Sequence, residues 1–298
     1  MALMEPRFLS TKTGTIQFPA YCPVTTFGNR YPLDQLIRPY LPRLAPAVMV
    51  SYYYAQFMNI NERLPMPMMV DSGGFAALFE GSIIRKRNGL GTLIIEREDE
   101  RETLTPHKVL RFQERIADIA FTLDFPIPPG LPEKEGFRRQ ELTISNALWA
   151  LDNRKQNNMK LYGCIQAWDE TSAENNADAY RNSNFDGIAI GGLVPRAKNK
   201  KLIEDIVKSV RKVCLHQPLH VFGLGKPETA KWLFEMGVDS VDSSSYVQAA
   251  AAGRIWGQEA SIKHPTTFER SHIALNNLCI AQGKKVPPQL AWQLEQVV

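Results

Sequence analysis

Residues 219–245 read LHVFGLGKPETAKWLFEMGVDSVDSSS. A short apolar run over 219–225 ends in Gly-Leu-Gly. Lys226, Pro227 and Glu228 then begin a segment that predicts a helix, because proline in the first turn gives up only a backbone N–H that has no partner there. A second apolar run over 238–245 follows and ends in Asp242 and three serines. The order of run, helix and run predicts two parallel strands joined by a crossover helix.

The same unit recurs along the chain. Apolar runs that end in Gly, Asp, Ser or Gln occupy 20–27, 47–54, 66–75, 116–126, 159–167, 187–193, 219–225 and 238–245, and segments with helical spacing lie between them. Residues 202–213 are such a segment, with apolar side chains on one face and lysines on the other. Eight units predict an α/β fold, a (β/α)8 TIM barrel. An open doubly wound sheet is the alternative that this alternation also allows.

Two regions depart from the alternation. Residues 80–104 have no helical period, and Asn88-Gly89 separates two strand-like runs, which predicts a β-hairpin inserted after the third barrel strand. Residues 266–298 predict a short helical tail, with helices over 267–282 and 288–297 packed outside the barrel. Because α/β barrels reach ~250 residues as one unit, residues 1–298 are expected to form a single domain.

Composition excludes several classes of protein. Hydrophobic residues make up 44% of the 298 and charged residues 22%, which is typical of a globular protein with a large core. The net charge of +4 permits a polyanionic partner without requiring one. The four cysteines are far apart, so neither a disulfide framework nor a zinc finger is expected. No apolar run reaches the ~18 residues of a membrane helix, and a cytoplasmic location is expected.

Reactive side chains of a barrel lie at the carboxyl ends of its strands. Reading those ends gives a set of carboxylates, an amide, glycines and aromatic rings with no histidine: Tyr52–Tyr54, Asp71–Phe75, Asp124, Gln166, Gly191–Leu193, Phe222–Gly225, Asp239 and Asp242. Paired carboxylates in an aromatic cavity suit cleavage of a glycosidic bond, in which one attacks or stabilises the sugar carbon and the other moves a proton.

The pieces, taken in order, resemble the tRNA-guanine transglycosylase superfamily. The matching stretches are 70–75 (VDSGGF), 104–106 (LTP), 123–126 (LDFP), Gly163 with Gln166, 190–195 (IGGLVP), 222–227 (FGLGKP), and Gly237 with Asp239, Asp242 and Ser243. They extend from about residue 20 to about residue 260. The resemblance implies a barrel enzyme that cleaves the N-glycosidic bond of a nucleotide and normally inserts a 7-deazaguanine base.

The resemblance also implies roles for individual residues. Asp242 would be the nucleophile on C1′, and Asp71 the general acid/base for the departing or incoming base. The base would lie between Phe75 and Phe222, since a flipped purine stacks on both faces. Its edge would meet the remaining base-binding residues, which are Ser72, Asp124, Gln166, Gly191, Gly192 and Leu193.

Two departures from the family pattern concern the substrate. The zinc ligands of members that act on tRNA are missing, since Cys279 is the only cysteine after Asp242, and no metal or other cofactor is expected. The family's selectivity glutamate is replaced by the stretch 194–197 (VPRA), and its glutamine by Ala76. Zinc-free relatives act on DNA, so DNA is the expected partner and tRNA the less favoured one. Cations that flank the predicted barrel mouth are the expected contacts to the nucleic-acid backbone: Arg85, Lys86, Arg87, Arg196, Lys198 and Lys200.

Four readings of the function stay open at this stage. The first is base exchange in DNA. The second is a hydrolytic DNA glycosylase, as in phage defence, that removes a modified base and leaves an abasic site. The third is an inactive nucleic-acid-binding subunit, which the presence of both Asp71 and Asp242 disfavours. The fourth is an unrelated barrel enzyme that acts on a small molecule. The oligomeric state is not predicted.

Overall fold

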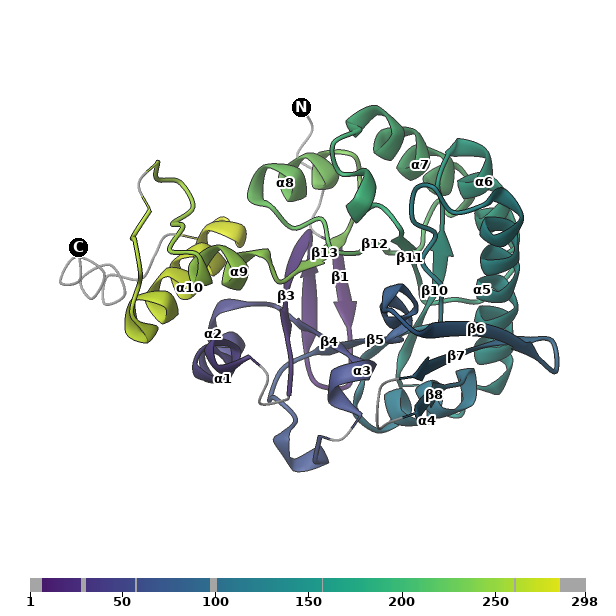
Figure 1. Cartoon of the computed structure of the whole chain (residues 1–298), viewed down its shortest axis with the longest axis horizontal. Coiled ribbons are helices and arrows are strands. Elements are labelled where there is room, and N and C mark those ends of the chain that lie inside the picture. The colour runs from purple at the N-terminus through teal and green to yellow at the C-terminus, as the bar shows by residue number, and fades with distance from the viewer. Residues whose placement is uncertain are drawn as a thin grey trace.

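The computed structural model describes residues 7–27, 31–56, 58–96, 101–156, 158–259 and 261–284. Eight parallel strands form a closed barrel (Figure 1). Each strand pairs with the next one along the chain, and the last pairs with the first, which confirms the predicted (β/α)8 fold over the open sheet. The strands are β3 (Ala20–Thr25), β4 (Val48–Ser51), β5 (Met68–Asp71), β9 (Ile119–Phe121), β10 (Lys160–Gln166), β11 (Gly187–Gly191), β12 (Leu219–Val221) and β13 (Ser240–Ser243).

Helices lie between the strands and cover the barrel. Thr105 caps the helix after it by accepting from the N–H of Lys108 (3.2 Å), and both this helix and the one at Pro227 begin where proline predicts. The α-helices are α1 (Pro32–Ile37), α2 (Leu41–Leu44), α3 (Tyr52–Ala55), α4 (Pro106–Ile116), α5 (Glu133–Asn153), α6 (Glu170–Asp178), α7 (Lys200–Val213), α8 (Pro227–Glu235), α9 (Ser245–Ala251) and α10 (Thr267–Ala281). Short 3-10 turns are η1 (Arg38–Tyr40), η2 (Ile60–Glu62), η3 (Gly74–Leu78) and η4 (Val194–Arg196).

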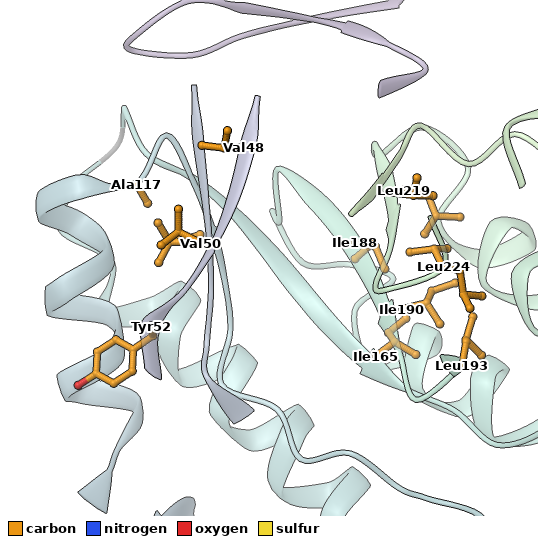
Figure 2. Packing of buried hydrophobic residues seen from close by; sticks show 14 of the residues in the cluster. Val48, Val50, Tyr52, Ala117, Ile165, Ile188, Ile190, Leu193, Leu219 and Leu224 are labelled. Carbon is orange, nitrogen blue, oxygen red and sulfur yellow. The ribbon is translucent and has the colours of Figure 1, made fainter. Parts of the chain in front are cut away.

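Alternate residues of the strands face opposite sides of the barrel wall. Val48 and Val50 on β4, and Ile188 and Ile190 on β11, pack outward against the helix layer (Figure 2). The alternate residues of the strands point inward and fill the barrel as a separate apolar cluster. It includes Met49, Met69, Ile119, Phe121, Tyr162, Cys164 and Ala189. Asp71 and Gln166 each come two residues after a member of that interior cluster, so strand periodicity alone turns both side chains inward.

The insertion after β5 is a small antiparallel sheet. β6 (Ser82–Arg87) and β7 (Leu90–Glu96) form the predicted hairpin, and its turn residues Asn88 and Gly89 take φ values of 50° and 81°. The third strand, β8 (Arg101–Leu104), pairs with β7 and was not predicted. Asn146 on α5 accepts from the N–H of Gly91 (2.9 Å), which fixes the sheet against the barrel's helix layer.

A second hairpin, which was not predicted, closes the amino end of the barrel. It consists of β1 (Arg7–Ser10) and β2 (Thr15–Phe18). Ile16 and Phe18 are buried in the barrel interior. Asp239, which the sequence reading placed among the strand ends of the reactive face, precedes β13 and lies at this opposite end. It forms ion pairs with Arg7 (2.7 Å) and Arg211 (2.9 Å), so the assignment of Asp239 to the reactive face is wrong.

The carboxyl-terminal region lies beside the barrel. α10 packs on α9 and α1, at the end of the molecule's long axis away from α5 (Figure 1). α10 confirms the predicted helix over 267–282, whereas the predicted helix over 288–297 lies outside the described residues. Among the described residues, no helix is both long and apolar enough to cross a bilayer.

Candidate active site

A cavity of about 410 Å³ opens where the barrel strands end. It gathers nine of the residues that the sequence predicts for the catalytic and base-binding site: Asp71, Ser72, Phe75, Asp124, Gln166, Gly191, Gly192, Phe222 and Asp242. These residues come from six different strand ends, and the volume lies in the range of small-molecule sites. The closed barrel therefore brings together side chains that are up to 171 positions apart in the chain.

Asp71 ends β5 and stands at the edge of this cavity. Its Oδ1 accepts hydrogen bonds from the backbone N–H groups of Gly73 (2.7 Å) and Tyr52 (3.3 Å). The pKa of Asp71 is raised to about 7, chiefly by burial and to a smaller extent by the neighbouring carboxylates of Asp242 and Asp124, against the lowering effect of the hydrogen bond from the Gly73 N–H. A carboxyl group that titrates near neutral pH can both donate and accept a proton, which suits a general acid/base.

Asp124, Ser72 and Gln166 form a polar wall of the cavity. The two oxygens of the Asp124 carboxylate accept from different donors: Oδ1 from the Ser72 hydroxyl (2.7 Å) and Oδ2 from the Gln166 amide. Burial raises the pKa of Asp124 above its usual range. Gln166 Oε1 is buried and has no hydrogen-bond partner among the residues that the structure describes. The wall therefore presents acceptors to whatever enters the cavity.

Glycines allow the backbone to approach this wall. A Cβ at Gly191 would lie 2.3 Å from Gln166 Nε2, and one at Gly74 would lie 2.0 Å from the Asp124 carbonyl oxygen. Any other residue would displace the wall. Leu193, predicted as a base-binding residue, is fully buried among Ile165, Ile190 and Leu224 and does not line the cavity (Figure 2). β11 ends at Gly191, and the positive φ of Gly192 (77°) breaks the strand alternation, so the side chain of Leu193 packs in the outer apolar cluster with Ile190.

Phe75 and Phe222 lie on the cavity lining as separate aromatic walls. Phe75 packs against Tyr54, with ring centroids 5.9 Å apart, and also against Tyr53 and Phe79. Phe222 packs edge-on against Phe121 at 4.9 Å. Each ring is supported from behind, so its cavity face is held in place for a flat ligand.

Asp242 ends β13 and has a partner that the sequence reading missed. Its Oδ1 accepts from the Gly223 N–H (3.0 Å) and lies 3.1 Å from His220 Nε2. His220 lies within β12, below the strand end, and it does not line the cavity, so the set of strand-end residues did not include it. His220 is two residues before Phe222 and pairs in register with Ser240, two residues before Asp242. The two-residue strand period is therefore a sequence signal that places His220 on the inner face of the barrel, below Phe222 and Asp242.

The predicted backbone cations differ in their surroundings. Arg196 is half-buried and donates to the carbonyl oxygens of Gly192 (2.7 Å) and Ile127 (2.9 Å). Burial lowers its pKa. These contacts assign Arg196 to support of the Gly192 loop, which differs from the predicted phosphate contact.

The other cations lie on the surface. Lys200 lies over the Trp232 ring (5.7 Å), and Lys86 pairs with the exposed Glu141 (2.9 Å). Arg85, Arg87 and Lys198 are exposed. The described residues contain no group of three or more His, Cys, Asp or Glu side chains placed to hold a metal ion.

Comparison with known proteins agrees with this geometry. A family model described as queuine tRNA-ribosyltransferase matches residues 44–282. The tRNA-guanine(15) transglycosylase of Methanothermobacter thermautotrophicus is 25% identical over 275 residues, which cover 86% of this chain and 38% of that protein. The queuine tRNA-ribosyltransferase of Pseudoalteromonas atlantica is 25% identical over 266 residues, which cover 84% of this chain and 71% of that protein. The chain thus spans well under half of the archaeal relative's length. Since the family model covers most of the chain, including every strand of the barrel but the first, this chain belongs to the queuine tRNA-ribosyltransferase family.

Proposed function

We propose that this protein cleaves the N-glycosidic bond of a guanine-type nucleotide in a nucleic acid and exchanges the base, with DNA as the preferred substrate and a 7-deazaguanine as the incoming base. One observation supports the proposal above all others. Two carboxylates at strand ends, Asp71 and Asp242, share one cavity with two aromatic walls and a wall of hydrogen-bond acceptors. Glycosidic exchange needs a nucleophile, a proton carrier and a recognised base, and the cavity offers candidates for all three.

The acceptor wall fits one edge of guanine. Asp124 and the unpaired Gln166 Oε1 accept hydrogen bonds, and guanine presents N1–H and N2–H2 as donors on that edge. The backbone N–H groups near Gly191 are candidates to donate to the guanine O6. Phe75 and Phe222 would stack on the two faces of the ring after the nucleotide has flipped out of its strand.

The proposed reaction has two half-steps. An oxygen of Asp242 forms a bond to C1′ while the C1′–N bond breaks, and the bonding pair leaves with the base, which takes the proton of the Asp71 carboxylic acid. The incoming base then gives its proton to the Asp71 carboxylate and attacks C1′, which releases the Asp242 carboxylate. The pKa of Asp71, about 7, lets the same group act as acid in the first half and base in the second.

The preference for DNA rests on the sequence after β13. The only cysteine there is Cys279, which is buried in α10, so the zinc ligands that the family resemblance implies for action on tRNA are missing. The exposed cations Arg85, Arg87 and Lys198 are the remaining candidates for phosphate contacts. The apolar side chains of Val194 and Pro195 line the cavity where the family has its selectivity glutamate, so a neutral substituent on the base is expected.

Mass spectrometry of nucleosides tests the proposal. The protein is incubated with matched DNA and unmodified tRNA, with and without a free 7-deazaguanine base, beside an Asp242→Asn control that keeps the shape and removes the charge. A deazaguanosine in the DNA is the expected product. Release of free base that leaves abasic sites would show that the reaction is hydrolysis and would overturn base exchange. Modification of tRNA alone would overturn the DNA preference. No released base from either nucleic acid would overturn the function itself.

A further inference from the structure

We infer that His220 is a positioning residue for Asp242, which fixes one carboxylate oxygen so that the other faces the sugar. The inference rests on the proposed function, because it assigns a role within the same reaction. Both hydrogen bonds that the described residues make to the Asp242 carboxylate go to Oδ1, from His220 Nε2 (3.1 Å) and the Gly223 N–H (3.0 Å). A carboxylate with one oxygen held by two donors has a defined orientation, which leaves Oδ2 as the attacking atom.

The neighbours of His220 define which ring nitrogen carries the proton. His220 is fully buried, and its Nδ1 lies 2.8 Å from the hydroxyl of Ser240, which is also buried. A carboxylate only accepts hydrogen bonds, so Nε2 must carry the proton that faces Asp242. A serine hydroxyl can donate to Nδ1 or accept from it, so Ser240 holds the other side of the ring in either case. The hydrogen bonds therefore connect Ser240 through His220 to Asp242.

Packing holds the imidazole ring in this plane. The ring lies 5.0 Å from Phe121 and 4.9 Å from Phe222, measured between centroids, inside the barrel. Phe222 is also a cavity wall, so the same aromatic group fixes the histidine and the proposed base-stacking surface. The arrangement costs no reorganisation when Asp242 attacks, because its partner cannot rotate away.

The hydrogen bonds to Oδ1 act in both half-steps. When Oδ2 bonds to C1′, the carboxylate charge is lost and Oδ1 becomes an ester carbonyl that still accepts from His220. When the incoming base attacks, the C1′–Oδ2 bond breaks and its electron pair returns to the carboxylate, which the two donors stabilise more strongly than the ester. Loss of the His220 donor is therefore expected to slow turnover and to leave binding of the nucleic acid unchanged.

Three variants separate the hydrogen bond from packing. His220→Phe keeps an aromatic ring in the barrel and removes both hydrogen bonds. His220→Gln keeps an amide N–H near the position of Nε2. His272→Phe is the matched control, since His272 is also buried but lies in α10, away from the cavity. Incorporation of radiolabelled guanine into unmodified duplex DNA and into unmodified tRNA gives kcat and KM, and thermal unfolding reports the fold.

The expected result is a fall in kcat of about 10- to 100-fold for His220→Phe, with KM within about 2-fold and substantial recovery in His220→Gln, as for the loss of a hydrogen bond to a charged group. The control should match the wild type. A His220→Phe protein with kcat within about 3-fold of the wild type would overturn the inference. So would a His220→Gln protein that folds normally and recovers nothing.

A second measurement does not depend on activity. In the full chain labelled with 15N-histidine, NMR is expected to find the His220 proton on Nε2, and its exchange-protected signal should disappear in Asp242→Ala. A wild-type ring with no proton on Nε2 would overturn the inference even if the enzyme is active. If the wild type neither incorporates labelled guanine nor releases a base from either nucleic acid, the proposed function fails, and the NMR result still decides whether His220 donates to Asp242.

Discussion

Asp71→Asn is expected to stabilise the folded protein at alkaline pH while it abolishes most of the activity. The pKa of Asp71 is raised from 3.8 to about 7, chiefly by burial. Each pKa unit is worth about 1.4 kcal/mol, so ionised Asp71 destabilises the fold by up to about 4 kcal/mol. Because the side chain borders the open cavity, solvent screening reduces this, and about 2–4 kcal/mol is expected. Asparagine has the same shape and no charge.

The sign of the pH dependence follows from proton binding. Well below pH 4 the Asp71 carboxyl group is protonated in both the folded and the unfolded wild type. The wild type and Asp71→Asn should therefore have similar free energies of unfolding there. Between about pH 4 and pH 7 the folded state holds the proton more tightly than the unfolded chain, so the wild type loses stability as the pH rises and the variant does not. Above pH 7 the difference should stay constant at its largest value.

Urea unfolding of both proteins at intervals from pH 4 to pH 8.5 measures this difference, and other titrating groups cancel in the comparison. Base release by the variant should fall by about 10²- to 10⁴-fold, the range for loss of a general acid/base. A free-energy difference that does not change between pH 5 and pH 8 would refute the raised pKa. An unchanged pH–rate profile in the variant would refute the proton-transfer role.

Three further perturbations test other parts of the structure. Gly191→Ala should raise KM or abolish turnover, because its Cβ would lie 2.3 Å from Gln166 Nε2, whereas Gly136→Ala in α5, whose Cβ meets only a methyl group at 3.5 Å, should leave kcat and KM unchanged. Asp118→Ala should lower the free energy of unfolding in urea by about 2–3 kcal/mol, since it removes a buried carboxylate that pairs with an arginine at the barrel floor; a loss below about 1 kcal/mol would contradict this. Lys198→Glu should weaken DNA binding and reduce the slope of log Kd against log salt by about 1, and an unchanged slope would remove this lysine from the interface.

The barrel could be predicted from the sequence because its signals are local. Each strand is a short apolar run, and several helix starts have their own proline or side-chain cap, as Thr105 and Lys226-Pro227 do. The Asn88-Gly89 turn predicts its hairpin because few residues other than glycine and asparagine adopt positive φ there. The carboxylates Asp71 and Asp242 could also be located, since a barrel places every strand's carboxyl end on one face.

Other features depend on contacts between distant parts of the chain. β1, β2 and β8 are four residues each and lie outside the alternation of runs and helices that predicts the barrel. Each is held by pairing in a small separate sheet, β1 with β2 and β8 with β7, which no local signal announces. Asp239 and Arg196 carry ordinary charged side chains, and no local pattern specifies their distant partners, Arg7 and the Ile127 carbonyl. Periodicity can turn a side chain inward, but it cannot state how close two inward side chains come. The contact of His220 with Asp242 arises because the register of β12 against β13 sets the two side chains at neighbouring levels, and that register is fixed only when the barrel closes.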